Sequence, residues 1–260
     1  MQRFLFLILL LSLAPLSLSA ETPVEKGLAI AQETDRRDTG FGNYTTEATM
    51  RLRDAQGGES VRNFRMGVLE VLGDGDKTLT VLTQPPDVAG TSVLTFSHGL
   101  EPDDQWVYFP SLKRVKRIAG KNKSGPFMGS EFAYEDLGSW EVKKYVYRYL
   151  RDEVVDGHKC YVIENIPAYE HSGYTRQKEW VDKTIHQPRK IVYYDRQNAL
   201  LKTLTFGQYQ QYLDKYWRAS TMLMQNHQTG KSTHIAWQAY RFRVNLNEQD
   251  FTQRALARER

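Results

Sequence analysis

Apolar and polar residues alternate with a period of two along most of the chain, from Tyr44 to Val244. This spacing is typical of β-strands that bury one face, because successive side chains of a strand point to opposite sides. Glycine-containing pairs such as Gly57-Gly58 and Asp156-Gly157 interrupt the alternation and indicate antiparallel hairpins. The expected strands are residues 44–53, 61–72, 78–82, 92–97, 105–109, 144–154, 158–165, 177–182, 189–194, 200–209, 219–226 and 233–244.

Helical patterns are few and lie outside the strand-rich region. Residues 23–36 carry Val24, Leu28, Ile30 and Ala31 at helical spacing, and residues 250–260 favour a short terminal helix. Residues 120–138 hold several glycines and are expected to form a long loop. Since helices do not alternate with strands, a parallel α/β fold is excluded. We predict one mainly β domain over residues 21–260, an antiparallel sheet of about ten strands.

The first twenty residues have the layout of a secretory signal peptide. A short positive start ends at Arg3, residues 4–14 are almost purely apolar, and small residues lead to Ala20. The apolar run is shorter than the ~20 residues of a membrane-spanning helix, which disfavours the alternative of an uncleaved anchor. We therefore expect residues 1–20 to be removed near Ala20 and the remaining chain to be exported.

Candidate catalytic chemistry is scarce. The chain has one cysteine, Cys160, which excludes a disulfide framework and a thiolate metal cluster. Its six histidines do not form the HExxH pattern of zinc hydrolases, and the GxSxG sequence of serine hydrolases is missing. We therefore expect a protein that is not an enzyme and that uses no metal and no cofactor.

The positive charge of the chain is concentrated in one segment. The chain has 35 Lys and Arg against 31 Asp and Glu, a formal net charge of +4. Residues 105–130 contain no acid and six basic residues, which are Lys113, Arg114, Lys116, Arg117, Lys121 and Lys123. Three interpretations remain open: a basic hairpin that pairs with the acids from Glu131 to Asp136, a surface for anionic membranes or acidic proteins, or a nucleic-acid site. Nucleic acid is the least favoured, because an exported protein seldom meets it.

The same segment resembles a known family. The sequence WVYFPSLKRVKRI at residues 106–118 and the sequence FMGSEFAYEDL at residues 127–137 are similar to motifs of the outer-membrane lipoprotein-sorting family of LolA-like exported bacterial proteins. Residues 180–182, 189–191 and 200–202 resemble later strands of that family. The resemblance extends from about Tyr44 to Val244.

This resemblance implies a fold and a function. The fold would be an open β half-barrel with a helical or loop lid over an apolar concave face. The function would be that of a periplasmic carrier of acyl-bearing molecules, lipid or lipoprotein, with an inner-membrane exporter of the resistance–nodulation–division type as a partner. A non-carrying adaptor that docks on such an exporter is the alternative, in which the aromatic residues simply fill a closed core.

The motifs supply the candidate site residues. We expect the apolar lining and gate of the hollow to include Trp106, Tyr108, Phe127, Met128, Phe132 and Tyr134. Of the two faces of the strand at 105–109, the one with Trp106 and Tyr108 is predicted to border the hollow. Contact with an exporter or, transiently, with a membrane surface is assigned to Lys113, Arg114, Lys116 and Arg117. The glycine-containing stretch of residues 127–137 is expected to gate the hollow, and some of these basic residues are expected to hold Glu135 or Asp136 and so to fix the gate.

Overall fold

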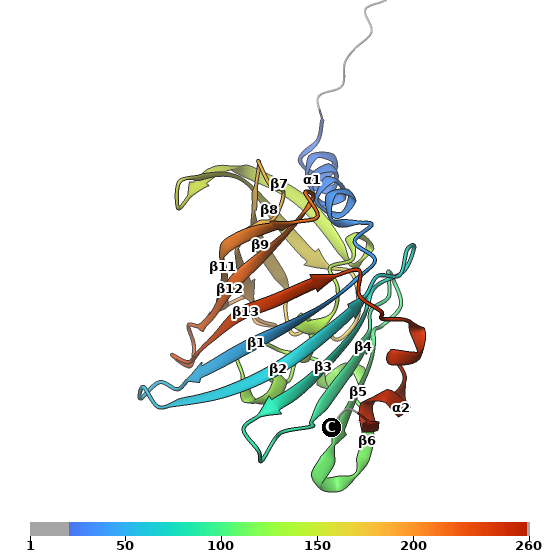
Figure 1. Ribbon diagram of the computed structural model, residues 1–260. Coiled ribbons are helices and arrows are strands. Elements are labelled where there is room, and N and C mark those ends of the chain that lie inside the picture. The colour runs from blue at the N-terminus through green and yellow to red at the C-terminus, as the bar shows by residue number, and fades with distance from the viewer. Residues whose placement is uncertain (1–20, 259–260) are drawn as a thin grey trace, which may run out of the picture.

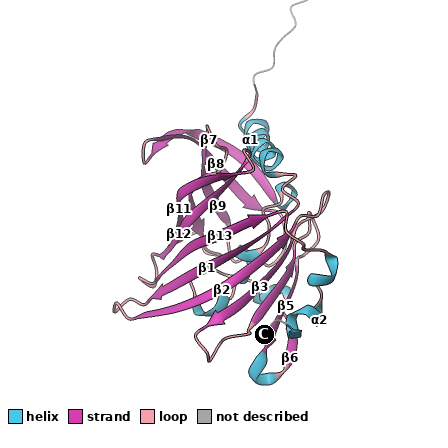
Figure 2. Cartoon of the chain, viewed as in Figure 1, coloured by secondary structure: helices cyan, strands magenta, loops and turns pink. Residues whose placement is uncertain are grey.

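The computed structural model describes residues 21–258 and consists mainly of one continuous antiparallel sheet of thirteen strands (Figure 1, Figure 2). From edge to edge the strand order is β6-β5-β4-β3-β2-β1-β13-β12-β11-β10-β9-β8-β7. The strands are β1 (Asn43–Arg53), β2 (Glu59–Leu69), β3 (Lys77–Gln84), β4 (Ser92–Phe96), β5 (Asp104–Phe109), β6 (Arg114–Arg117), β7 (Tyr145–Val155), β8 (His158–Pro167), β9 (Arg176–Asp182), β10 (Pro188–Tyr194), β11 (Leu200–Tyr212), β12 (Tyr216–Asn226) and β13 (Ser232–Phe242).

The sheet curls but does not close. Strands β6 and β7 are its two ends, and Figure 1 shows the sheet curving strongly from one end to the other. The antiparallel, open half-barrel predicted from the sequence is therefore confirmed. One strand was not predicted, β6, because Val115 is the only apolar residue among its four.

The opening helix α1 (Pro23–Asp38) begins with strong local signals. Pro23 occupies its first turn, and Thr22 and Glu25 form a reciprocal capping box at its N-terminus. Gly27 lies directly on strand β7: a Cβ atom there would be 2.8 Å from the backbone nitrogens of Arg148 and Tyr149. The helix can therefore approach the sheet this closely only with glycine at that position.

Helix α1 covers the concave face at the β7–β9 end of the sheet. Its Ile30 and Ala31 pack with Tyr147, Ile163 and Val181, which come from β7, β8 and β9. The second helix, α2 (Gln253–Arg258), packs instead on the convex face, where Leu256 and Phe251 join a separate cluster. Short 3-10 helices complete the structure: η1 (Pro110–Leu112), η2 (Gly120–Asn122), η3 (Phe127–Gly129), η4 (Tyr134–Leu137), η5 (Val142–Lys144) and η6 (Glu248–Asp250).

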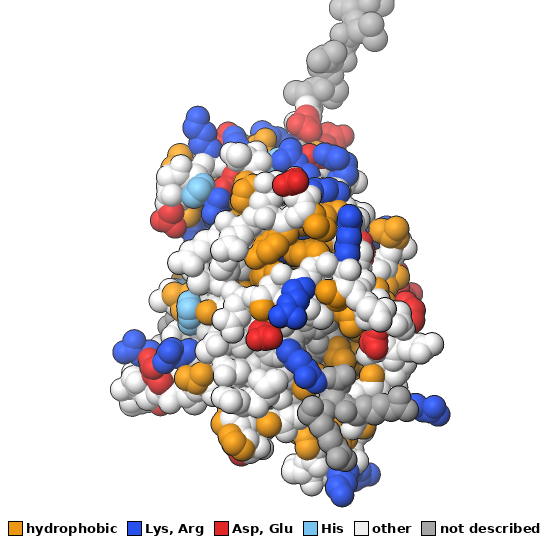
Figure 3. Space-filling view, in the orientation of Figure 1, with side chains coloured by type: hydrophobic (Ala, Val, Ile, Leu, Met, Phe, Trp, Pro, Cys, Tyr) orange, Lys and Arg blue, Asp and Glu red, His pale blue; other side chains and the backbone are white. Residues whose placement is uncertain are grey.

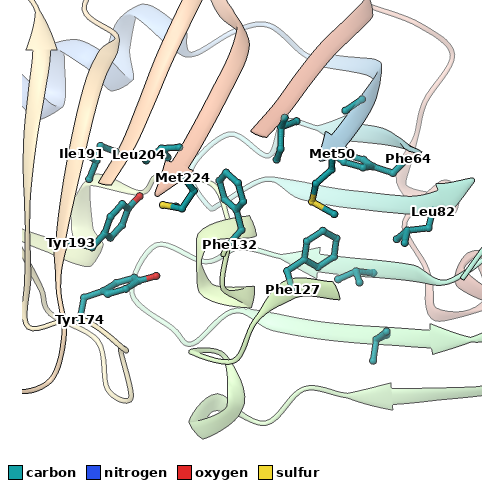
Figure 4. Packing of buried hydrophobic residues seen from close by; sticks show 14 residues of the cluster. Met50, Phe64, Leu82, Phe127, Phe132, Tyr174, Ile191, Tyr193, Leu204 and Met224 are labelled. Carbon is teal, nitrogen blue, oxygen red and sulfur yellow. The ribbon is translucent and has the colours of Figure 1, made fainter. Parts of the chain in front are cut away.

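The largest apolar cluster lies on the concave face. It combines alternate residues of many strands with Phe127 and Phe132 from the loop between β6 and β7. Figure 4 shows these two rings reaching up from the loop, Phe127 toward Met50 and Phe132 toward Met224. The long loop is thus part of the core rather than a surface excursion.

No helix among residues 21–258 is long and apolar enough to cross a membrane. The predicted signal peptide, residues 1–20, lies outside the described residues.

Candidate ligand-binding cavity

A cavity of about 870 Å³ lies inside the half-barrel, between the sheet, helix α1 and the loop of residues 120–138. Its apolar lining comes mainly from β10 to β13 and includes Ile191, Tyr193, Leu204, Phe206, Met222 and Trp237. Sites for small organic ligands are usually about 300–1,000 Å³ and mostly apolar, so this cavity has the size and character of a ligand site. In Figure 3 hydrophobic side chains gather in the middle of the visible face, below α1.

The loop of residues 120–138, here called the plug, fills the other part of the concave face. Its Asp136 carboxylate is 2.8 Å from the ammonium of Lys202 on β11, and both side chains are less than one-tenth exposed. Asp136 also accepts a hydrogen bond of 2.8 Å from the hydroxyl of Tyr174, and Lys202 donates to the carbonyl of Glu131 at 2.9 Å. This buried ion pair, with its additional hydrogen bonds, attaches the plug to strand β11.

Neighbouring residues strengthen the same attachment. Glu135 accepts hydrogen bonds from the Ser172 hydroxyl and the Gly173 backbone amide, at 3.0 and 2.9 Å. Burial, with the nearby Asp136 charge as a smaller cause, raises the pKa of Glu135 to about 7. Glu131 is held by the Asn226 side-chain amide at 2.6 Å. The acidic residues of the motif are therefore anchors for the plug.

Strands β12 and β13 diverge beside the cavity, which both strands line. Their register runs from Thr221 opposite Ala236 to Gln225 opposite Ser232, although β12 begins earlier and β13 continues further. Beyond the paired residues, contacts between aromatic rings connect the two strands and the β11–β12 turn. The ring centroids of Tyr212 and Tyr240 are 5.3 Å apart, and those of the stacked Tyr216 and Phe242 are 6.0 Å apart.

An arginine joins this seam to the helix. The guanidinium of Arg218 lies over the rings of Phe41, Tyr44 and Phe242 at 5.4 to 5.6 Å, and it donates a hydrogen bond of 2.5 Å to Asp38 at the end of α1. Because Asp38 and Arg218 also line the cavity, the end of the helix forms part of its rim.

The predicted lining residues divide into three groups. Phe132 lines the cavity. Phe127, Met128 and Tyr134 pack in the concave cluster but are absent from the cavity wall. Trp106 and Tyr108 lie in the convex cluster with Leu256.

The face predicted for the strand at 105–109 was therefore wrong. Val107 and Phe109 belong to the concave cluster, whereas Trp106 and Tyr108 face the opposite side, where α2 covers them. Alternation separates the two faces of a strand but does not say which one is concave, and large aromatics suit either face when a helix covers the outer one.

The basic residues remain on the surface. Lys113, Arg114, Lys116 and Arg117 are all exposed, on or beside the edge strand β6. Arg117 forms an ion pair with Asp104 on β5. The expectation that some of these residues hold Glu135 or Asp136 was wrong, because Lys202 and the segment from Ser172 to Tyr174 do so.

Other important residues were missed by sequence reasoning. Lys202 follows two leucines on a predicted strand, so its pattern is that of an ordinary solvated lysine. Gln177 and Glu179 occupy the buried positions of β9, and both line the cavity. Alternation predicts apolar residues at these two inward positions. The polar residues found there instead were a signal that sequence reasoning could have used.

Several proteins of known structure resemble this chain in sequence and fold. A family model described only as that of an uncharacterised protein matches residues 74–258. The crystal structure of a candidate outer membrane lipoprotein-sorting protein domain from Vibrio parahaemolyticus is 55% identical, with a TM-score of 0.88 over 90% of this chain and 99% of that one. A DUF1329 family protein from Desulfovibrio piger is 31% identical, with a TM-score of 0.86 over the same shares.

A more distant structure has the same fold. A LolA superfamily protein from Nitrosomonas europaea is 19% identical, with a TM-score of 0.70 over 88% of this chain and 98% of that one. A search of curated proteins found no match.

Proposed function

Because this chain belongs to the DUF1329 family of LolA-like proteins, we propose that it is a periplasmic carrier that holds the acyl part of a lipid or lipoprotein in its cavity. The observation that carries the proposal is the apolar cavity between α1 and the plug, which an acyl chain can enter without unfolding the sheet. Each methylene moved from water into such a site contributes about 0.8 kcal/mol, so one chain supplies the affinity a carrier needs. The proposed role is binding and transfer without catalysis.

The signal-like residues 1–20 support export of the carrier. We expect the mature protein to begin near Ala20 or Glu21 and to be recovered in the periplasmic fraction. N-terminal sequencing checks this, and a membrane-bound form that retains Met1 would contradict it.

Bound cargo is the direct test. The protein is expressed with residues 1–20 in a Gram-negative host, purified from the periplasm without detergent, and extracted for mass spectrometry of lipids. We expect acyl-bearing species in stoichiometric amount. Protein that is empty, and that takes up no lipid from vesicles, would overturn the proposal and favour the non-carrying adaptor.

A pair of variants ties the cargo to the cavity. Met222 on β12 lines the cavity and packs in the concave cluster, so Met222→Trp places an indole in it. The next residue, Leu223, points to the opposite face of the strand, so Leu223→Trp introduces the same side chain on the convex face. We expect M222W to lower bound lipid severalfold and L223W to leave it unchanged. Equal lipid content in both variants would show that the cargo lies elsewhere.

The exposed basic residues at β6 support a second part of the proposal, docking on an anionic membrane surface. We expect Lys113→Glu combined with Lys116→Glu to weaken sedimentation with anionic vesicles and to slow transfer at low salt, with acyl binding unchanged. Lys159→Glu with Lys231→Glu is a control with the same charge change at other exposed positions. Equal sedimentation of both double variants would remove the docking role.

The family resemblance, together with an exposed basic edge, supports an inner-membrane exporter of the resistance–nodulation–division type as donor or acceptor of the cargo. Photo-crosslinking from position 113 in living cells tests this contact. We expect a crosslinked product that contains such an exporter, and crosslinks confined to lipid would remove the exporter from the proposal.

A further inference from the structure

The cavity has an unusual polar floor near α1. Strands β8 and β9 place Asn165 opposite Gln177, and Glu179 lies two residues further on the same face of β9. On the other side of β9, strand β10 places Tyr193 opposite Gln177 and Ile191 opposite Glu179, and both of these β10 residues line the cavity. Two polar side chains thus lie directly beside an apolar part of the wall.

These three side chains are almost completely buried and only partly hydrogen-bonded. Asn165 donates a hydrogen bond of 2.7 Å to the Glu179 carboxylate. The side-chain oxygens of Asn165 and Gln177 are buried without a hydrogen-bond partner. An unsatisfied buried acceptor costs about 1–3 kcal/mol, so buried polar groups of folded proteins are seldom left in this state. Lys202 and Asp136, equally buried beneath the plug, are fully engaged by comparison.

The electrostatics of the floor favour a particular kind of ligand group. Burial raises the pKa of Glu179 to about 7, opposed by the hydrogen bond from Asn165, and no basic side chain of the described residues contributes to that shift. An anionic headgroup placed against this floor would therefore meet the Glu179 carboxyl group and the free acceptor oxygen of Gln177, while Lys144 and Arg218, which also line the cavity, are already paired with Asp103 and Asp38. A hydroxyl or amide N–H would supply the missing donors.

We propose that Gln177 and Glu179, with Asn165 positioning the Glu179 carboxyl group, form a headgroup subsite that selects acyl-bearing ligands with neutral hydroxyl or amide donors over anionic ones. The inference rests on the proposed carrier function and adds its ligand class. The acyl chain lies along Ile191, Leu204 and Met222, and the donor group of the ligand satisfies the side-chain oxygen of Gln177.

Three probes with the same twelve-carbon chain test the selection. Monolauroylglycerol carries hydroxyl donors, methyl laurate carries none, and laurate is an anion. Each competes with the fluorescent probe N-phenyl-naphthylamine for the delipidated full-length protein. We expect monolauroylglycerol to bind roughly tenfold more tightly than the other two, since one satisfied buried hydrogen bond is worth about that factor.

Variants assign the preference to the floor. Gln177→Leu keeps the size of the side chain and removes its acceptor, so the preference for monolauroylglycerol over methyl laurate should fall severalfold. Gln225→Leu is the same change at an exposed position of β12 and should leave the preference intact. Glu179→Gln removes the buried negative charge, so at pH 8 laurate should bind severalfold more tightly than it does to the unaltered protein.

The outcomes separate the subsite from the carrier function. Equal affinity for monolauroylglycerol and methyl laurate, or an unchanged preference in folded Q177L, overturns the subsite and leaves the carrier standing. If Q177L does not fold, unchanged laurate binding by E179Q overturns it instead. Failure of all three probes to displace the fluorescent probe contradicts the carrier function itself.

Discussion

The plug and helix α1 cover two parts of the same concave face but are held in different ways. The plug is fixed by the buried Lys202–Asp136 pair and by hydrogen bonds that reach β11, β12 and β13. Helix α1 buries only Gly27, Ile30 and Ala31, and the Asp38 that ends it is more than one-third exposed. Because the ion pair that holds the end of the helix is partly exposed, whereas the pair that holds the plug is buried, we expect α1 to move when cargo enters, while the plug stays in place.

This comparison changes which segment is the gate. The glycine-containing motif of residues 127–137 was predicted to open and close, but its acids make buried contacts that a moving gate would have to break. The same contacts explain the motif in another way, as the set of residues that holds a rigid wall against the cavity.

The largest expected effect comes from breaking the plug's attachment. Lys202→Ala leaves the Asp136 carboxylate buried without its cation, so we expect the free energy of unfolding to fall by about 3–5 kcal/mol. Arg51→Ala, which removes one partner of the exposed Arg51–Glu59 pair, is the control and should cost at most about 1 kcal/mol. Urea denaturation followed by tryptophan fluorescence measures both. Equal losses in the two variants would mean that the plug is not held by this pair.

The second largest effect is a pH dependence of the free energy of unfolding, which arises from the buried Glu179 carboxyl group. The pKa of Glu179 is raised to about 7 from an ordinary 4.5, so the folded protein binds this proton more tightly than the unfolded chain does. Its stabilising contribution is therefore complete at low pH and is lost as the pH rises through 7. We expect Glu179→Gln to be about 2–3 kcal/mol more stable than the unaltered protein at pH 8 and nearly equal to it at pH 4.5.

The difference in stability between Glu179→Gln and the unaltered protein isolates the contribution of the Glu179 carboxyl group. Asp76 and Glu135 also have pKa values raised to about 7 by burial, but both remain in the variant and cancel in the difference. Thermal denaturation at several pH values supplies the measurement. A stability difference that does not vary with pH would show that Glu179 keeps the same protonation state throughout.

The smallest effect concerns the helix itself. Gly27→Ala would ordinarily stabilise a helix by up to about 1 kcal/mol, but here the new methyl group meets the backbone of β7. We expect the global stability to change by less than about 1 kcal/mol, because α1 can lift away from the sheet while the remaining core persists. Hydrogen exchange should become faster in residues 23–38 and stay unchanged in residues 127–137. Faster exchange in the plug as well would show that the two covers move together.

The sequence predicted the bounds of the helices and strands well, but it predicted their tertiary contacts poorly. The opening helix was expected over 23–36 and is Pro23–Asp38, and β9 was expected over 177–182 and is Arg176–Asp182. Local periodicity suffices for such features, because every strand repeats the same alternation.

The site depends on contacts that periodicity does not contain. Lys202 is buried only because Glu131 and Asp136 fold back onto β11 from more than sixty positions earlier in the chain. Trp106 and Tyr108 face outward because α2, at the opposite end of the chain, covers that side. The family motif at residues 127–137 correctly marked the plug as part of the candidate site. The residues that bind the plug, such as Lys202, have no sequence pattern that distinguishes them from ordinary strand residues.

The open sheet leaves two strand edges, and they bear on aggregation. An unpaired edge exposes backbone donors and acceptors to which another copy of the chain can add a strand. Strand β6 is four residues long, and three of these residues are the exposed Arg114, Lys116 and Arg117. Short, lysine- and arginine-rich edges resist such pairing, so these charges would protect the β6 edge from adding a strand of another copy, whatever surface they also contact.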